Sequence, residues 1–241
     1  MKDIVLEVKE LRKEYKRDVI LNGISFDIQK GHIYGLIGNN GAGKTSIFRL
    51  IAGLTRPQSG TISLFGETDD KKNEKNRKRC GFLVESPIFY PDLSASKNLM
   101  LQAELKGITD KKHIDELLSL VGLDANSGKK VKDYSTGMKQ RYGIAFALIG
   151  WPELLILDEP LNGMDVSMMD KTSELFKYLC EEKNMTLIIS SHLLSRLQQV
   201  ATDYIILHEG SIIKNISSEE LDKESRGMDL EDYFRLLINR R

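Results

Sequence analysis

The chain has 241 residues, and its 35 Lys and Arg are balanced by 35 Asp and Glu, so its formal net charge is zero. This neutrality argues against a nucleic-acid partner, because nucleic-acid-binding chains carry a basic patch. Hydrophobic residues at 41% and charged residues at 29% exclude a disordered or collagen-like chain.

Cysteine and apolar patterning give two further expectations. The only cysteines, Cys80 and Cys180, lie too far apart for a metal motif, so we expect both to be reduced and buried. The N-terminus lacks the apolar core of a signal peptide. No apolar run reaches the roughly 18 residues that span a bilayer. The chain is therefore expected not to cross a membrane by itself, although a partner can hold it there.

The first third of the chain alternates strands with a loop and a helix. Residues 4–8 and 24–28 alternate apolar and polar side chains, which predicts strands. Residues 33–37 are wholly apolar and predict a strand buried on both faces. A glycine-rich loop and a helix from Lys44 to about Leu54 follow. Further strands are predicted at 60–65 and 80–84, on either side of a charged tract at 69–79.

The middle of the chain reads as helices, and strands then return. Apolar residues recur at helical spacing within residues 95–150, at Leu99, Ala103, Leu105, Ile114, Leu117, Leu118 and Val121. The later elements are predicted as strands at 154–157 and 187–189, a helix at 168–183, a hairpin of 204–208 with 211–214 turning at Glu209-Gly210, and short helices within 218–241. The pattern predicts one α/β domain: a core of about 1–85 and 152–215, a helical insert of about 86–151, and a C-terminal extension of about 216–241.

The strongest motif is Gly38-x4-Gly43-Lys44-Thr45 between the predicted strand and helix. Glycines let backbone N–H groups surround phosphate oxygens, and the helix N-terminus adds a positive potential. Lys44 is expected to reach the β- and γ-phosphates, and the Thr45 hydroxyl to bind Mg²⁺.

Two acids follow the apolar strand at 154–157. Asp158 at such a strand end can hold Mg²⁺ through water beside a phosphate loop. Glu159, one residue further, is placed to act as general base toward an attacking water. The alternative is ordinary turn chemistry, which the phosphate loop on the same chain disfavours.

Two more segments have a functional and a structural interpretation. His192, after the strand at 187–189, can sense a γ-phosphate, although a lone histidine is more often structural. The segment Tyr134–Arg141 offers Ser135 and Gly137 at a predicted helix start, where they can bind an anion. Taken alone, Ser135 reads as a helix N-cap.

In this order and spacing, the motifs resemble the ATP-binding-cassette ATPases over residues 3–215. The resemblance implies a P-loop NTPase (RecA-like) core with an antiparallel β subdomain and an inserted α-helical subdomain. It implies ATP and Mg²⁺ as ligands, with Lys44, Glu159 and His192 as catalytic residues and Thr45, Glu85 and Asp158 toward the metal. The ATP-binding residues that it implies are Tyr15, which stacks on adenine, and Gly38, Asn39, Asn40, Gly41, Ala42, Gly43, Lys44, Thr45 and Ser46.

The resemblance also implies partners. Two cassettes pair head to tail when ATP binds, and the signature segment of each covers the nucleotide of the other; a loop at Asn162, Gly163 and Asp165 touches the partner. The signature residues are Ser135, Thr136, Gly137, Met138, Lys139 and Gln140. Transmembrane permease subunits are the other partner, so the expected location is the cytoplasmic face of a bacterial membrane. The loop 86–93, with Phe89 and Tyr90, is the expected permease dock, unless these aromatics belong to the core.

Two departures from the family pattern refine this picture. Thr136 replaces a signature glycine, and Met138-Lys139 interrupts the usual Gly-Gln pair, which we do not interpret as inactivating. Glu85 stands where the family has a glutamine that binds Mg²⁺ and water; it keeps an oxygen ligand and loses an amide donor. A glutamate there resembles the subgroup that protects bacteria against lantibiotics and bacitracin-like peptides.

Two other functional classes are weighed against a transporter subunit. A non-transport cassette of repair, translation or iron–sulfur assembly is the first; the translation and repair versions usually have two cassettes or long inserts, and this chain has neither. An unrelated P-loop kinase or GTPase is the second; it would lack the signature segment, and a GTPase would need an Asn-Lys-x-Asp element, which the sequence lacks.

Overall fold

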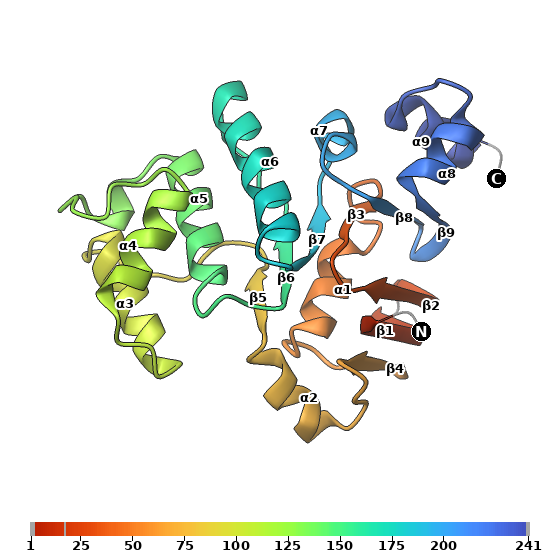
Figure 1. Ribbon diagram of the computed structural model, residues 1–241. Helices are drawn as coiled ribbons and strands as arrows, with labels where there is room; N and C mark the ends of the chain where they lie inside the picture. The colour runs from red at the N-terminus through yellow and green to blue at the C-terminus, as the bar shows by residue number, and fades with distance from the viewer. Residues whose placement is uncertain (1–2, 17, 240–241) are drawn as a thin grey trace.

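Two sheets organise the computed structural model, which describes residues 3–16 and 18–239. A six-stranded sheet has the order β5-β6-β7-β3-β8-β9, and a three-stranded sheet has the order β2-β1-β4 (Figure 1). The strands are β1 Ile4–Tyr15, β2 Asp18–Gln29, β3 Ile33–Ile37, β4 Ser59–Leu64, β5 Cys80–Leu83, β6 Leu154–Asp158, β7 Thr186–Ser190, β8 Asp203–His208 and β9 Ser211–Ser217. The helices are α1 Lys44–Ile51, α2 Asp70–Arg77, α3 Ala95–Leu105, α4 Lys111–Leu120, α5 Thr136–Ala147, α6 Val166–Glu181, α7 Leu194–Gln198, α8 Ser218–Ser225 and α9 Leu230–Asn239, with a 3-10 turn η1 Val131–Asp133.

The central strands of the larger sheet are apolar because both of their faces are covered. Every residue of β3, β6 and β7 is buried, and these strands pair in parallel with β5 and β8. Only β9 is antiparallel, through the predicted hairpin with β8. Glu209 and Gly210 both have positive φ, the turn geometry that fits the twist of a hairpin. This arrangement brings the carboxyl ends of β3, β6 and β7 to one edge.

The smaller sheet is antiparallel, and its strands run further than the alternation predicts. β1 and β2 each cover twelve residues, whereas the sequence pattern marked only 4–8 and 24–28. Their pairing contains several register shifts, which interrupt the alternation of buried and exposed side chains. The period-two pattern therefore fades before the strands end.

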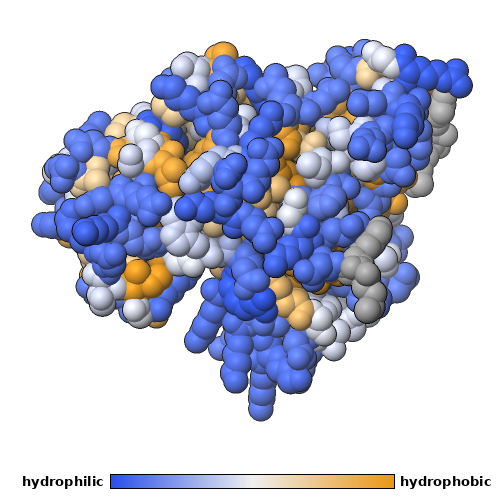
Figure 2. Space-filling view, viewed as in Figure 1, coloured by the Kyte–Doolittle hydropathy of each residue, from blue (hydrophilic) through white to orange (hydrophobic). Residues whose placement is uncertain are grey.

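The charged tract at 69–79 contains a helix that the sequence analysis missed. α2 has a single buried residue, Asn73, whose side chain binds the backbone of Leu64 and Ile62 at 3.2 and 2.9 Å. Asp69 caps it by accepting from the Lys72 N–H. A helix held by polar contacts has no apolar face to reveal it. Figure 2 shows its charged side chains projecting at the bottom of the view.

The region between β5 and β6 consists of α3, α4 and α5, which stand beside the sheet (Figure 1). The apolar face predicted for α4 is confirmed: Ile114, Leu117 and Leu118 are buried. The face predicted for α3 is wrong at Leu105, which is 82% exposed. α1 is also shorter than predicted, because it ends at Ile51 and Gly53 follows with φ +74°.

The loop before α3 corrects one expectation about aromatic exposure. Tyr90 is exposed, but Phe89 is partly buried against the core, and its ring meets the Tyr142 ring edge-on with 6.1 Å between the ring centres. Ile88 is the most exposed apolar side chain of this loop, at 80%. Phe89 therefore belongs partly to the core, and Ile88 and Tyr90 form the accessible surface.

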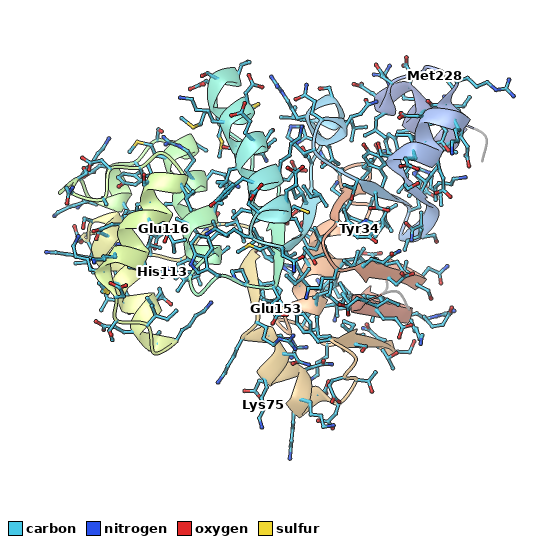
Figure 3. All side chains as sticks on the ribbon, viewed as in Figure 1. Tyr34, Lys75, His113, Glu116, Glu153 and Met228 are labelled. Carbon is cyan, nitrogen blue, oxygen red and sulfur yellow. The ribbon has the colours of Figure 1, made fainter. Side chains whose placement is uncertain are left out.

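The remaining polar and sulfur groups fit a packed interior. Cys80 and Cys180 are buried free thiols, as expected. Figure 3 labels Tyr34 on β3 and Glu153 before β6. Burial raises the pKa of Tyr34 to about 12, and Glu153 receives two hydrogen bonds from Arg79, at 2.7 and 2.9 Å. No helix in the described residues is long and apolar enough to span a bilayer.

The described part of the predicted C-terminal extension contains α8 and α9; its last residues, 240–241, lie outside the described residues. Ser217 and Glu220 form a capping box that begins α8. Leu230, Tyr233 and Phe234 on α9 are buried in the larger hydrophobic core. The two helices stand together beside β9 and α7 (Figure 1).

Candidate functional site

The phosphate loop connects β3 to α1, as the sequence predicts. Gly38 needs the absence of a side chain, because a Cβ there would lie 2.6 Å from the Leu207 carbonyl oxygen. Gly43 has φ +111° and precedes the first residue of α1. The loop therefore closes tightly and leaves its N–H groups and the helix N-terminus available to an anion.

Lys44 is held inside this loop. Its ammonium donates to the carbonyl oxygens of Gly38 at 2.6 Å and Asn39 at 3.3 Å, and the residue is 8% exposed. Burial lowers the pKa of Lys44 from its ordinary value, and the carboxylates of Glu159 and Asp158 oppose that shift. A cation stripped of water next to a phosphate loop is suited to bind phosphate oxygens.

Asp158 joins the phosphate loop to β7. Thr45 Oγ1 donates to Asp158 Oδ2 at 2.7 Å, and Ser190 Oγ donates to Asp158 Oδ1 at 2.5 Å. The Ser190 hydroxyl also accepts from the Glu159 N–H at 3.0 Å. Because Ser190 is fully buried at the end of β7, this network fixes both acids at the carboxyl end of β6, the parallel strand beside it.

Glu159 and His192 form a pair at the same sheet edge. His192 Nδ1 lies 2.8 Å from Glu159 Oε2, and the same oxygen accepts from the His192 N–H at 3.2 Å. Glu159 has φ +49°, a strained conformation for a residue with a side chain. The predicted base and the predicted γ-phosphate sensor are thus in direct contact.

A cavity of about 540 Å³ lies over the phosphate loop. Residues 39–46, Asp158 and Glu159 line it, and Tyr15 and Ile20 form another part of its wall. Tyr15 is 38% exposed, with the Lys13 ammonium 4.8 Å from its ring centre. An accessible aromatic ring at this position offers a flat surface to a base.

Thr45 and Asp158 provide an oxygen pair that fits Mg²⁺. This ion takes one or two protein carboxylates, with substrate phosphates and water completing its shell. Within the described residues, no group of three or more His, Cys, Asp or Glu side chains gathers into a metal site by itself. Glu85 lines the same cavity, but its carboxylate is paired with Arg49, a partner that the sequence analysis did not identify.

The signature segment begins α5. Ser135 accepts from the Met138 N–H at 3.3 Å and so acts as the N-cap, and Ser135 and Thr136 are exposed. Gln140 differs from its neighbours: it lines the nucleotide cavity of its own chain and donates to the Glu159 carbonyl oxygen at 2.9 Å. Sequence reasoning gave no signal for this link.

The loop at 162–165 packs directly against the signature. A Cβ on Gly163, which has φ +72°, would lie 2.6 Å from Thr136 Cγ2. Asn162 lines the nucleotide cavity. Asp165 caps α6 by accepting from the Met168 N–H at 2.9 Å. The structure thus places the signature and this loop together as one surface.

Known proteins share this arrangement. The sequence profile of the family described as "ABC transporter" matches residues 21–162. The bacitracin transport ATP-binding protein BcrA of Bacillus licheniformis is 41% identical, over 92% of this chain and 72% of its own length. The lantibiotic transport ATP-binding protein SrtF of Streptococcus pyogenes is 38% identical, over 95% of this chain and 96% of its own.

A solved structure extends the agreement to the whole fold. The ATP-binding subunit of an ABC transporter superposes with a TM-score of 0.87 at 28% identity, covering 97% of this chain and 99% of that one. The expected P-loop NTPase fold is thereby confirmed. With its phosphate loop, its acidic strand end and these relatives, the chain belongs to the ATP-binding ATPases of the ABC transporter family.

Proposed function

We propose that this chain hydrolyses ATP to power a bacterial permease that exports antimicrobial peptides of the bacitracin or lantibiotic class. The observation that carries this proposal is the similarity to the bacitracin and lantibiotic transport proteins over more than nine tenths of the chain. A non-transport cassette is disfavoured, since those relatives are named as transport proteins. The chain would act at the cytoplasmic face of the membrane, held there by the permease.

The site supports hydrolysis by an in-line water. Lys44 binds the terminal phosphates, and Thr45 with Asp158 would hold Mg²⁺, which neutralises phosphate charge when bound. Glu159 accepts the proton of the attacking water. His192, 2.8 Å from Glu159, keeps that carboxylate oriented. Tyr15 stacks on the adenine ring.

One chain supplies only part of this chemistry. Ser135 and Thr136 are exposed at the start of α5, and Ser135 uses its hydroxyl to cap its own helix. A free helix N-terminus with a serine and Gly137 is suited to bind an anion. We assign that anion as the γ-phosphate held by a second cassette, so that two ATP molecules lie between two head-to-tail copies.

A groove beside the nucleotide cavity supports permease docking. It holds about 270 Å³ and is lined mainly by apolar side chains, among them Phe82, Pro87 and Phe146. Leu54 and Ile88 at its rim are 67% and 80% exposed. Ser86 lines both this groove and the nucleotide cavity, so a permease segment seated here touches the chain next to the γ-phosphate position.

Glu85 is proposed to bind Mg²⁺ once the two cassettes close. In the structure its carboxylate pairs with Arg49, but both side chains are partly exposed, so the pair exchanges at little cost. ATPase and transport of Glu85→Gln and Glu85→Ala should be measured with the permease present. The proposal predicts that the alanine variant loses more activity; unchanged ATPase and transport in Glu85→Ala exclude the role.

The overall proposal is tested by resistance. The chain and its permease are expressed together in a susceptible bacterium, and growth is measured against bacitracin and a lantibiotic. We expect resistance that Lys44→Ala abolishes. Equal growth of the native and Lys44→Ala strains against both peptides would exclude an ATP-driven role in their transport.

A further inference from the structure

A second cleft borders the phosphate loop away from the base-binding end. It has a volume of about 470 Å³, and α9 forms one of its walls. Asn39 and Asn40 line both this cleft and the nucleotide cavity. Its other polar side chains are His192 on one side and Glu231, Arg235 and Asn239 on α9. The C-terminal helix therefore faces the same loop and histidine that handle phosphate.

The wall formed by α9 is fixed to the core. Leu230, Tyr233 and Phe234 are at most 7% exposed, and the Leu230 N–H donates to Gln198 Oε1 at 3.1 Å. α9 also contacts α7, which begins two residues after His192. Anything that fills the cleft therefore meets a helix that is packed on the core and continuous with the segment that carries His192.

The signature surface supplies a segment that fits this position. Gly163 lies against Thr136, so residues 162–165 and the signature form one continuous surface. If the signature of one copy covers the nucleotide of another, as proposed above, this loop must arrive beside it. The neighbouring space along Asn39 and Asn40 is the cleft in front of α9.

Opposite charges on Arg235 in the cleft and Asp165 on the loop indicate which side chains meet. Arg235 is 66% exposed at its side chain, and its one ion pair among the described residues is with Glu231, one turn away on the same helix, at 2.6 Å. Such an exposed pair contributes little, and a guanidinium has donors for a second carboxylate. Asp165 is exposed, and only its Oδ1 is used, in capping α6. Its Oδ2 has no hydrogen bond within the described residues.

We propose that the cleft receives residues 162–165 of a second copy of this chain, and that Arg235 on α9 pairs there with the second copy's Asp165. This inference rests on the proposed head-to-tail dimer and adds the C-terminal helix to its interface. The pair forms twice in a symmetric dimer, because each copy contributes one cleft and one loop.

The test is ATP-dependent dimerisation in a Glu159→Gln background, where hydrolysis cannot separate the copies. Sedimentation with Mg²⁺ and ATP gives the dimer dissociation constant for the parent, Arg235→Ala, Asp165→Asn and the double variant. Asparagine keeps the capping oxygen of α6 and removes the charge. Lys223→Ala, a basic residue of α8 outside the cleft, is the matched control.

We expect each single variant to weaken the dimer about 10-fold, with the double variant no weaker than either, and Lys223→Ala unchanged. Dimerisation of Arg235→Ala equal to the parent, or losses that add in the double variant, would overturn the pairing while the dimer stands. A parent that stays monomeric with ATP overturns both proposals, because no second copy is then available. Circular dichroism confirms that each variant is folded.

Discussion

The nucleotide pocket and the signature surface differ in how their polar groups are satisfied. Lys44, Asp158 and Ser190 are buried, and each finds its hydrogen-bond partner within the same chain. Lys44 donates to the Gly38 carbonyl oxygen, and Ser190 donates to Asp158. Ser135 and Thr136 are exposed; they begin a helix, and Thr136 packs against Gly163. A pocket assembled in advance binds its ligand without reorganisation, whereas an exposed helix start needs a partner to become a site. One chain thus carries a complete binding half and an incomplete covering half.

The largest effect is expected for a variant that loses ATP hydrolysis but keeps the nucleotide pocket intact. Glu159→Gln replaces the base by an amide that cannot accept the proton, so ATP hydrolysis should fall by about 10²- to 10⁴-fold. ATP binding should persist, and the dimer should accumulate. Phosphate release and nucleotide titration measure the two properties separately.

Glu153→Gln is the matched control, since Glu153 precedes the same strand, β6, at its opposite end. It should hydrolyse ATP at the native rate. Normal turnover in Glu159→Gln would remove that residue as the base.

The next largest effect is expected for a variant that disturbs only the signature surface. Gly163→Ala places a Cβ 2.6 Å from Thr136 Cγ2, which displaces the signature. Misplacement of about 1 Å costs up to about 100-fold in rate, so ATPase should fall about 10- to 100-fold. Nucleotide affinity of the monomer should not change, because the added Cβ meets Thr136 and Gly137, neither of which lines the nucleotide cavity.

Gly66→Ala separates the steric clash from backbone strain. Gly66 also has positive φ, at +83°, but nothing lies within 4 Å of its added Cβ. It should lose stability without losing signature function. Equal losses of ATPase in the two variants would show that strain, not displacement of the signature, is responsible.

The same contrast explains what the sequence could predict. The phosphate loop was readable because glycines, Lys44 and Thr45 act through local backbone geometry and lie between two strongly patterned elements. Asp158 and Glu159 were readable because they end an apolar strand. Each of these signals is contained in a few consecutive residues.

Contacts between distant segments left no such signal. Gln140 binds the Glu159 carbonyl, and Arg49 on α1 pairs with Glu85 after β5. α2 is held by Asn73, a polar residue whose partners belong to β4. Hydrophobic periodicity records burial of apolar faces and is silent about polar anchors, so these features required the fold.

A third effect concerns the stability of the binding half. Ser190→Ala removes a hydroxyl that donates to Asp158 and accepts from the Glu159 N–H, and so leaves a buried carboxylate under-bonded. The free energy of unfolding should fall by about 2 kcal/mol. Urea denaturation followed by circular dichroism measures it.

Ser173→Ala is the matched control for this loss. Ser173 on α6 is buried like Ser190, with 6% of its surface exposed. Its hydroxyl, however, has no hydrogen-bond partner among the described residues. Its removal should leave stability unchanged or slightly higher. A loss in Ser173→Ala as large as in Ser190→Ala would attribute the effect to cavity formation instead of the Asp158 network.

The smallest effect has the opposite sign and belongs to the covering half. Tyr142 on α5 is fully buried, its hydroxyl has no partner among the described residues, and burial raises its pKa. Its ring packs against Phe89 and Phe146, and phenylalanine keeps those contacts. Because an unsatisfied buried hydroxyl costs about 1 kcal/mol, Tyr142→Phe should stabilise the chain by that amount. A decrease in stability would show that the hydroxyl is satisfied in solution, and with it that the helix bearing the signature has a polar anchor of its own.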